Sequence, residues 1–245
     1  MILGLIPARL NSKRLKNKLL LNLNNIPLII HTMTNASKAK KLDKLLVCTD
    51  SKKIFDVVKK NNGNPIMTSK KFLNGTDRIA SVAKKYNANL IIDIQGDEIF
   101  IDPLLIDQLI EHHLKNNKYD IIVPCVKTKN YNDKSIVKFV FNKKSEITDM
   151  TREDVFFKKN SKFLYKQVDI ISFKPRKLQF FSKLKRTLNE KKKNIELQRA
   201  LDNDFKIKTF IIKTDSFSIN TKKDYLNAKK YINSNNGKNK SKHII

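Results

Sequence analysis

A chain of 245 residues with 40% hydrophobic residues can bury a sizeable core, and it suits one α/β domain with a small insertion better than two independent domains. The formal net charge of +28 raises the possibility of a nucleic-acid partner. The lysines, however, are spread over the whole length, without a concentrated stripe or an interleaved aromatic platform. We therefore expect no nucleic-acid partner and rank nucleic-acid binding last among the candidate functions.

The first apolar run is too short for a signal peptide or a membrane span, so a cytoplasmic protein with no membrane partner is expected. The two cysteines, Cys48 and Cys125, are isolated in apolar, strand-like segments. Free cysteine in such surroundings behaves as a small apolar residue. Both are predicted to be buried thiols rather than a disulfide or a metal pair.

The first twenty residues combine an apolar strand with a basic loop. Residues 2–6 predict a strand, and Pro7, which has no backbone donor, is predicted to end strand pairing. In open α/β sheets, ligands bind outside the carboxyl ends of the strands, where cations suit a polyphosphate. The alternative is an ordinary solvated basic turn. The cations of the loop are Arg9, Lys13, Arg14, Lys16 and Lys18.

Strand and helix patterns alternate over the next eighty residues. Helices are predicted over residues 26–39 and from residue 54 onward, and strands over residues 44–48 and 66–68. This alternation predicts a mostly parallel, Rossmann-like sheet flanked by helices on both faces.

A polar loop over residues 74–78 opens the following helix, and we expect Thr76 or Asp77 to cap it. A functional role would add that the exposed amides and Arg78 hold an anion or a sugar hydroxyl. Next, an apolar strand from residue 90 breaks at Gly96 into Asp97 and Glu98. Two carboxylates facing a cationic loop predict a magnesium site for nucleotide phosphates, although such a turn is common in other settings.

The second half of the chain predicts a small antiparallel insertion, at about residues 127–173, within a single domain over residues 1–232. His112 and His113, near the end of a helix over residues 104–114, are expected on the surface, favoured by the helix dipole. The tail, residues 233–245, is polar, basic and predicted to be disordered. The other predicted elements are strands over 121–126, 136–141, 146–150, 163–173 and 206–212, a strand-like segment over 217–221, and helices over 175–188, 195–201 and 222–232.

The chain resembles the sugar-acid cytidylyltransferases, and most closely the 3-deoxy-manno-octulosonate cytidylyltransferase (CMP-Kdo synthetase) family. Nearly the whole length takes part, and the order and spacing of the motifs are those of the family. The resemblance implies an α/β fold of the nucleotide-diphospho-sugar transferase type. Four segments carry it: residues 6–18, which begin Ile-Pro-Ala-Arg; 74–78, Asn-Gly-Thr-Asp-Arg; 95–98, Gln-Gly-Asp-Glu; and 195–201, Ile-Glu-Leu-Gln-Arg-Ala-Leu.

The resemblance implies transfer of CMP from CTP to a 3-deoxy-ulosonic acid, Kdo or a variant such as its 8-amino form, for lipopolysaccharide or surface polysaccharide synthesis. The anomeric hydroxyl of the sugar would attack the α-phosphorus of CTP and release pyrophosphate. Positioning and fixed cations would supply most of the catalysis. Mg²⁺ as cofactor and a homodimer are implied as well, with the interface expected around residues 136–150.

Individual roles follow from the resemblance, residue by residue. Arg9, Arg14 and Lys18 would hold the triphosphate, and Arg9, Lys18 and Asp97 would be catalytic, with Asp97 binding the metal. Arg78 and Gln95 would extend the nucleotide and sugar sites. The remaining sugar-side candidates are Arg152 for the sugar carboxylate, Glu196 for its hydroxyls, and Gln167.

The chain departs from the family pattern at three places, two of which lie on the sugar and metal side. Residues 16–17 are Lys-Asn where the family has Pro-Gly, and Gln167 and Asp169 stand where it usually has histidine and glycine. Asn220 replaces an aspartate that helps to bind magnesium; it keeps a carbonyl oxygen, so we retain it as a metal ligand. Asp215, Glu98 or the substrate could supply the missing charge. Two alternatives remain open: a catalytically impaired nucleotide-binding paralogue, and a cytidylyltransferase for another sugar acid.

Overall fold

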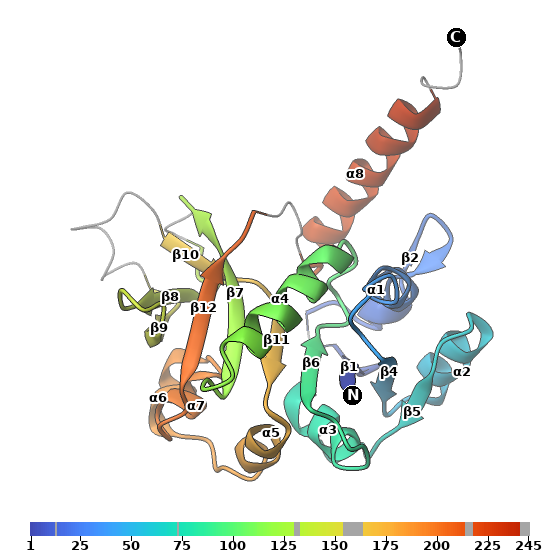
Figure 1. Ribbon diagram of the computed structural model, residues 1–245. Helices are drawn as coiled ribbons and strands as arrows, with labels where there is room; N and C mark the ends of the chain where they lie inside the picture. Colours follow the sequence, from blue (N-terminus) through green and yellow to red (C-terminus); the bar gives the residue numbers. More distant parts are fainter. Residues whose placement is uncertain (13, 73, 130–132, 154–163, 214–217, 241–245) are drawn as a thin grey trace.

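One large sheet organises the molecule. The computed structural model describes residues 1–12, 14–72, 74–129, 133–153, 164–213 and 218–240 (Figure 1). Ten strands of these residues form a sheet in the order β5-β4-β1-β6-β11-β7-β10-β8-β9, with β12 also paired to β7. A short hairpin of β2 (Asn22–Leu23) and β3 (Ile26–Pro27) stands apart. The sheet strands are β1 (Ile2–Ala8), β4 (Lys44–Thr49), β5 (Pro65–Met67), β6 (Leu90–Ile94), β7 (Ile121–Thr128), β8 (Lys138–Phe141), β9 (Ile147–Thr151), β10 (Leu164–Gln167), β11 (Ile170–Phe173) and β12 (Ile207–Ile211).

The sheet is mostly parallel in its centre and antiparallel at one end. Strands β5, β4, β1 and β6 pair in parallel, as do β7 and β12. Strand β11 runs antiparallel to both β6 and β7 and so joins the two parallel groups. Strands β10, β8 and β9 add an antiparallel extension. The predicted parallel sheet with an antiparallel excursion is confirmed.

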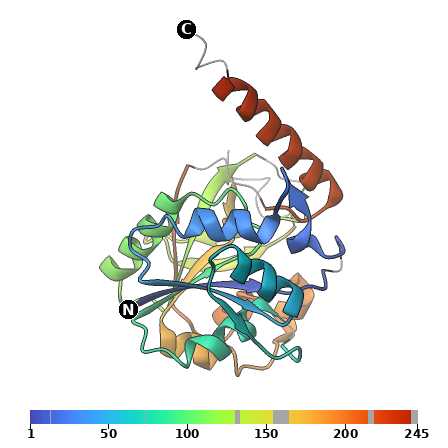
Figure 2. The ribbon, with the colours of Figure 1, turned by 90° about the vertical axis from the view of Figure 1, so that its right-hand side faces the viewer.

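Helices cover both faces of the sheet (Figures 1 and 2). Strand β1 shows why: Leu3 and Leu5 belong to one buried apolar cluster and Ile6 and Ala8 to another, so both faces must be covered. Helices α3, α5 and α7 pack into the first cluster, and α1, α2 and α4 into the second. The helices are α1 (Leu28–Ala36), α2 (Lys52–Lys60), α3 (Gly75–Ala83), α4 (Pro103–Lys115), α5 (Pro175–Phe181), α6 (Leu188–Lys193), α7 (Gln198–Leu201) and α8 (Lys222–Lys240), with a 3₁₀ turn, η1 (Lys18–Leu20).

Two local predictions in the first half are wrong. Pairing of β1 does not end before Pro7: Pro7 and Ala8 still pair with Cys48 and Thr49, whereas pairing with β6 stops at Leu5. A proline lacks only the donor, so its carbonyl can still serve the ladder. At α3, the cap is not Thr76 or Asp77. Asn74 caps the helix by accepting a 2.7 Å hydrogen bond from the Asp77 amide, because the helix begins earlier than predicted.

Several elements of the second half differ from the predicted bounds. The strand predicted over residues 163–173 divides into β10 and β11, with Val168 and Asp169 in the break. The helix predicted over 175–188 ends at Phe181. The last helix extends to Lys240 instead of Ile232 and projects from the body of the molecule (Figures 1 and 2). Residues 233–240 include no proline to stop a helix. Residues 217 and 241–245 lie outside the described residues.

His113 is buried, contrary to the predicted surface position. Its side chain is 2% exposed; Nδ1 is 2.6 Å from the Ser172 hydroxyl and Nε2 is 3.2 Å from the Tyr119 carbonyl oxygen. Burial lowers the pKa of His113 to about 4, which outweighs any effect of the helix dipole. Cys48 and Cys125 are buried free thiols, as predicted. Among the described residues, none of the helices has the length and apolar character needed to cross a membrane.

Candidate active site

Three loops meet closely where β1 and β6 end. A Cβ added at Gly75, at the start of α3, would lie 3.1 Å from the Pro7 ring, and one added at Gly96 would lie 3.0 Å from the Pro7 carbonyl oxygen. A larger residue at Gly96 would therefore press on the backbone of β1. The Thr32 hydroxyl donates a 2.9 Å hydrogen bond to the Gly96 carbonyl and so holds the loop after β6 against α1.

The basic loop after β1 lies next to the acidic loop after β6. The Lys18 ammonium forms an ion pair with the Asp97 carboxylate, and both side chains are largely buried, at 12% and 15% exposure. The Arg14 guanidinium donates a 2.7 Å hydrogen bond to Asn220 Oδ1. Arg9 is exposed at the start of the loop. The structure thus brings two of the three predicted phosphate-binding cations, Lys18 and Arg14, into contact with the two predicted metal ligands.

The donor chemistry at this place fits a magnesium ion. Asp97 offers carboxylate oxygens and Asn220 an amide oxygen, both of the hard type that Mg²⁺ prefers. Among the described residues, no three acidic, histidine or cysteine side chains gather as a metal-binding group. A magnesium ion here would depend on substrate phosphates for part of its coordination, as Mg²⁺ often does beside nucleotides.

Ser218 links a further pair of carboxylates to the site. Its hydroxyl donates to Glu98 Oε1 and lies 3.2 Å from Asp169 Oδ2, while the Ile219 amide donates to the Asp97 carbonyl at 3.2 Å. Glu98 is 3% exposed, so it is poorly placed to meet a substrate. The segment that carries Asn220 is in this way fastened to the loop after β6.

A buried carboxylate lies within β6, the strand that precedes the acidic loop. Asp93, in β6, is 1% exposed, and its described side-chain hydrogen bonds are those from Gln95 Nε2, at 3.1 Å to both oxygens. Burial, followed by the charges of Glu196 and Asp169, raises the pKa of Asp93 well above its usual value. Gln95 is therefore held in place by the Asp93 carboxyl group, whose buried surroundings disfavour its charged form.

Glu196, which lies just before α7, interacts by charge with Asp93. Burial raises the pKa of Glu196 to about 7, against the opposing effects of Arg199 and of a hydrogen bond from Thr76. Arg199 pairs with Glu196 at 3.1 Å and with Glu190 at 3.3 Å, and its guanidinium lies 4.3 Å from the centre of the Phe181 ring. Glu196 thus interacts with both Thr76 and Asp93 beside the start of α3.

Arg152 and Gln167 lie on the side of the antiparallel extension. Arg152 donates hydrogen bonds to the Ser135 and Lys134 carbonyls and, at 3.2 Å, to the Asn194 carbonyl. Gln167 Nε2 donates at 3.3 Å to Asp169 Oδ1. Both residues are partly exposed, so they can still meet a ligand.

Arg78 is the one predicted binding residue that the structure keeps away from the others. It is 2% exposed, its Nη2 donates to Asp50 Oδ2 at 2.7 Å, and its Nη1 donates to the Thr68 hydroxyl. Its donors are directed to the ends of β4 and β5 rather than into the site. In this conformation Arg78 positions the start of α3.

Comparisons with known proteins agree with this arrangement. The profile of the cytidylyltransferase family matches residues 3–230. The chain belongs to the cytidylyltransferase family. Among its relatives, the 3-deoxy-manno-octulosonate cytidylyltransferase of Thermodesulfovibrio yellowstonii is 36% identical over 248 residues, with 93% of this chain and 96% of that protein covered. The enzyme of the same name from Chlorobium phaeobacteroides is 33% identical over 228 residues, covering 90% and 92%. The resemblance seen in the sequence is confirmed.

Solved structures give the same grouping for this cytidylyltransferase. A CMP:2-keto-3-deoxy-manno-octonic acid synthetase complexed with CTP superposes with a TM-score of 0.91 at 25% identity, over 96% of this chain and 99% of that one. The 4-diphosphocytidyl-2C-methyl-D-erythritol synthase of Anaerococcus prevotii, at 16% identity and a TM-score of 0.62 over 95% of this chain and 98% of that one, shares the fold. The predicted fold type is confirmed.

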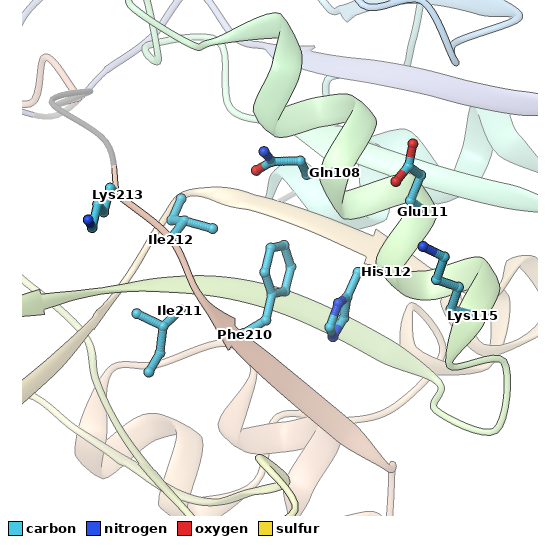
Figure 3. A pocket seen from close by; sticks show the side chains of 8 residues that line it. All are labelled: Gln108, Glu111, His112, Lys115, Phe210, Ile211, Ile212 and Lys213. Atoms are coloured by element: carbon cyan, nitrogen blue, oxygen red, sulfur yellow. The ribbon is translucent and has the colours of Figure 1, made fainter.

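A cavity of about 480 Å³ lies elsewhere in the cytidylyltransferase, between α4 and β12 (Figure 3). His112 and Phe210 stack at its floor, with ring centres 4.4 Å apart. None of the predicted site residues lines this cavity, and its charged residues include both an acid and bases. The candidate active site is therefore placed by the meeting of the loops and not by this cavity. The lining residues are Gln108, Glu111, His112, Lys115, Phe210, Ile211, Ile212 and Lys213.

Sequence reasoning missed three residues of the cytidylyltransferase site, Asp93, Asp169 and Ser218, as well as Asp50, which holds Arg78 away from that site. Asp93 carried a signal, since a single carboxylate in the apolar run over residues 90–94 invites the question of its partner. Asp169 was noted only as a departure from the family pattern. Asp50 and Ser218 have no local signal, because their partners are distant in the chain. Asp215, considered as a metal ligand, lies outside the described residues.

Proposed function

We propose that this cytidylyltransferase transfers CMP from CTP to a 3-deoxy-ulosonic acid of the Kdo type, with Mg²⁺, and releases pyrophosphate for lipopolysaccharide or surface polysaccharide synthesis. The observation that carries the proposal is the contact of the basic loop after β1 with Asp97 and Asn220. Cations and hard oxygen ligands meet there, as a metal-bound triphosphate requires. The relatives named for the same reaction cover nearly the full chain.

The chemical step places specific demands on the chain. The anomeric oxygen of the sugar forms a bond to the α-phosphorus, the bond from that phosphorus to the bridging oxygen breaks, and the electron pair leaves with pyrophosphate. Negative charge grows on the leaving group and the phosphate oxygens, so fixed cations stabilise the transition state. Arg9, Arg14 and Lys18 are the cations we assign to this role.

Bound Mg²⁺ would neutralise phosphate charge and help to ionise the attacking hydroxyl. Asp97 is the protein ligand that we assign to it, with Asn220 as the neutral oxygen retained from the sequence prediction. Lys18 contacts Asp97, and Arg14 donates to Asn220 Oδ1. Binding of a metal nucleotide therefore requires both cations to transfer from protein oxygens to phosphate oxygens.

The sugar would bind between α7, the end of β6 and the antiparallel extension. Gln95 and Glu196 offer hydrogen bonds to hydroxyls, and Gln167 lies beside them. Arg152 is the cation assigned to the sugar carboxylate, since its guanidinium can pair with a carboxylate and the residue is partly exposed. Whether the sugar is Kdo or its 8-amino form is decided by assaying both acids side by side.

The test is a pyrophosphate-release assay with CTP, Mg²⁺ and a panel of sugar acids. Release with a Kdo-type acid is the expected result. Binding of CTP without release from any acid would overturn the assignment and favour the catalytically impaired paralogue. Release only with another class of sugar acid would favour the other alternative.

Lys18→Ala should lower turnover by about 100-fold or more, because it removes a cation that stabilises the developing charge. Lys52→Ala is the matched control: Lys52 forms an exposed ion pair with Asp56, and the change should leave turnover intact. Thermal unfolding of both variants is measured alongside, since Lys18 also contacts Asp97. Wild-type turnover in Lys18→Ala would remove Lys18 from the mechanism.

A cytoplasmic homodimer completes the proposal. The sheet order ends at β9, and an end strand offers unpaired backbone groups to a second chain. The surrounding extension is where we place the interface. Light scattering coupled to size exclusion measures the mass directly, and a monomer at micromolar concentration would contradict the dimer.

A further inference from the structure

Asp169 lies beside the loop that carries Asp97, in the break between β10 and β11. Ile170 pairs with Ile94, and the Gln95 amide approaches the Asp169 carbonyl at 3.4 Å. The same register places Asp169 opposite Gln95, and Gln95 precedes Asp97 by two residues. Residues opposite each other in an antiparallel pair project from the same face. The sheet thus directs the Asp169 side chain to the face that carries Gln95.

The Asp169 carboxylate has only weak neutral contacts. Gln167 Nε2 lies 3.3 Å from Oδ1 and the Ser218 hydroxyl 3.2 Å from Oδ2. Among the described residues no cation forms an ion pair with it, although Lys166 and Arg152 are near enough to interact by charge. The residue is partly exposed. A carboxylate with neutral contacts at long range retains lone pairs for a ligand.

Asn220 is less suited to hold a cation. Its Oδ1 accepts a hydrogen bond from the Arg14 guanidinium at 2.7 Å, and the amide carries no charge to offset a metal ion beside that guanidinium. Glu98 is 3% exposed and already accepts from Ser218. Asp169 combines a negative charge, partial exposure and a place next to the Asp97 loop.

We propose that Asp169 supplies the second carboxylate ligand of the magnesium ion that binds with CTP, and so provides the charge that the Asn220 amide lacks. The inference rests on the proposed function, because it concerns the metal of the same reaction. It accounts for the amide at Asn220, because the charge is supplied from the break between β10 and β11 instead of from the segment before α8. Two carboxylates plus phosphate oxygens are a usual ligand set for Mg²⁺.

The test measures metal binding without turnover. Mn²⁺ replaces Mg²⁺, and its binding to the protein with CTP and no sugar is followed by electron paramagnetic resonance. Asp169→Asn should weaken Mn²⁺ binding by about 10-fold to 100-fold. Asn220→Ala should weaken it less than Asp169→Asn does. Asp56→Asn, which changes an exposed carboxylate of α2, is the matched control and should bind as the wild type.

The double variant Asp169→Asn with Asn220→Asp guards against misfolding as an explanation. Returning a carboxylate at Asn220 should restore part of the lost Mn²⁺ affinity, which a merely unfolded variant could not regain. Thermal unfolding of each variant without ligand gives the second control. Wild-type Mn²⁺ affinity in Asp169→Asn, with weaker sugar binding, would overturn the proposal and assign Asp169 to the sugar.

The outcome for the wild type separates this inference from the proposed function. If the wild type neither binds Mn²⁺ with CTP nor releases pyrophosphate, the proposed function fails. If the wild type is active and Asp169→Asn binds Mn²⁺ equally well, only the assignment of Asp169 fails.

Discussion

Lys18 and Arg78 are both cations near the carboxyl ends of the strands, but their surroundings give them different roles. Lys18 contacts Asp97 and keeps 12% of its side chain exposed. Arg78 keeps 2% and is enclosed by Asp50 and Thr68. A buried guanidinium whose carboxylate is removed becomes an uncompensated buried charge. Arg78 therefore contributes mainly to the shape of the site and Lys18 to its chemistry.

Asp50→Asn should lower the free energy of unfolding by about 3 kcal/mol, because it leaves Arg78 buried without its charge partner. The measurement is urea denaturation at neutral pH. Asp56→Asn, in the exposed pair with Lys52, is the control and should cost less than about 1 kcal/mol. Equal losses in the two variants would show that the Arg78 pair has no special structural weight.

Helix α4 is fixed to the sheet through a buried histidine. His113 bridges the Ser172 hydroxyl of β11 and the Tyr119 carbonyl oxygen of the turn that follows the helix. Desolvation lowers the pKa of His113 to about 4, against 6.5 in an unfolded chain. The helix is therefore joined to β11 by an imidazole that stays neutral at physiological pH.

The stability of the protein should fall as the pH drops from 6.5 towards 4. In that window the unfolded chain binds a proton at His113 and the folded chain does not. Neutral His113 therefore contributes up to roughly 3 kcal/mol to the free energy of unfolding above pH 6.5, and this contribution is lost as the pH falls towards 4. His113→Gln should lack this part of the pH dependence. Unfolding free energies of the two proteins over pH 4–8 provide the check.

Glu196 changes the stability with pH in the opposite direction to His113. The wild type must therefore be compared with His113→Gln. Its pKa is raised to about 7, so its protonation stabilises the folded chain as the pH falls through 7 towards the unfolded value of 4.5. Because Glu196 is present in both proteins, the difference between wild type and His113→Gln isolates the histidine. An unchanged difference across the pH range would contradict the assignment.

The whole molecule carries a net charge of +28, which acts both on stability and on ligand binding. Like charges spread over the surface repel one another and disfavour the compact state. The same field attracts a polyphosphate to the loop after β1. Added salt screens both effects over distances of about 10 Å at 0.1 M.

Raising NaCl from about 0.02 M to about 0.5 M should increase the melting temperature of the free protein and weaken CTP binding, because screening relieves repulsion and reduces attraction. Differential scanning fluorimetry and calorimetric titration measure the two quantities. A melting temperature that falls steadily with salt would show that attractive ion pairs dominate over net repulsion.

The sequence by itself determined the parallel core, the family and the residues of the basic and acidic loops. Strands buried on both faces are continuous apolar runs, and loops that bind phosphate or metal carry their charges in short contiguous segments. Both signals are local. The antiparallel excursion was visible for the same reason, as two short strands around a polar turn.

Tertiary structure alone decided which partner each of these side chains meets. Three contacts depend on how segments far apart in the chain are placed by the order and register of the strands. They are the contact of Arg78 with Asp50, that of His113 with Ser172, and the position of Asp169 opposite Gln95. A one-residue change in the register of β11 would turn Ser172 and the adjoining Asp169 to the other face of the sheet. Composition and spacing do not encode that register, so the metal and sugar side of the site emerges only from the folded sheet.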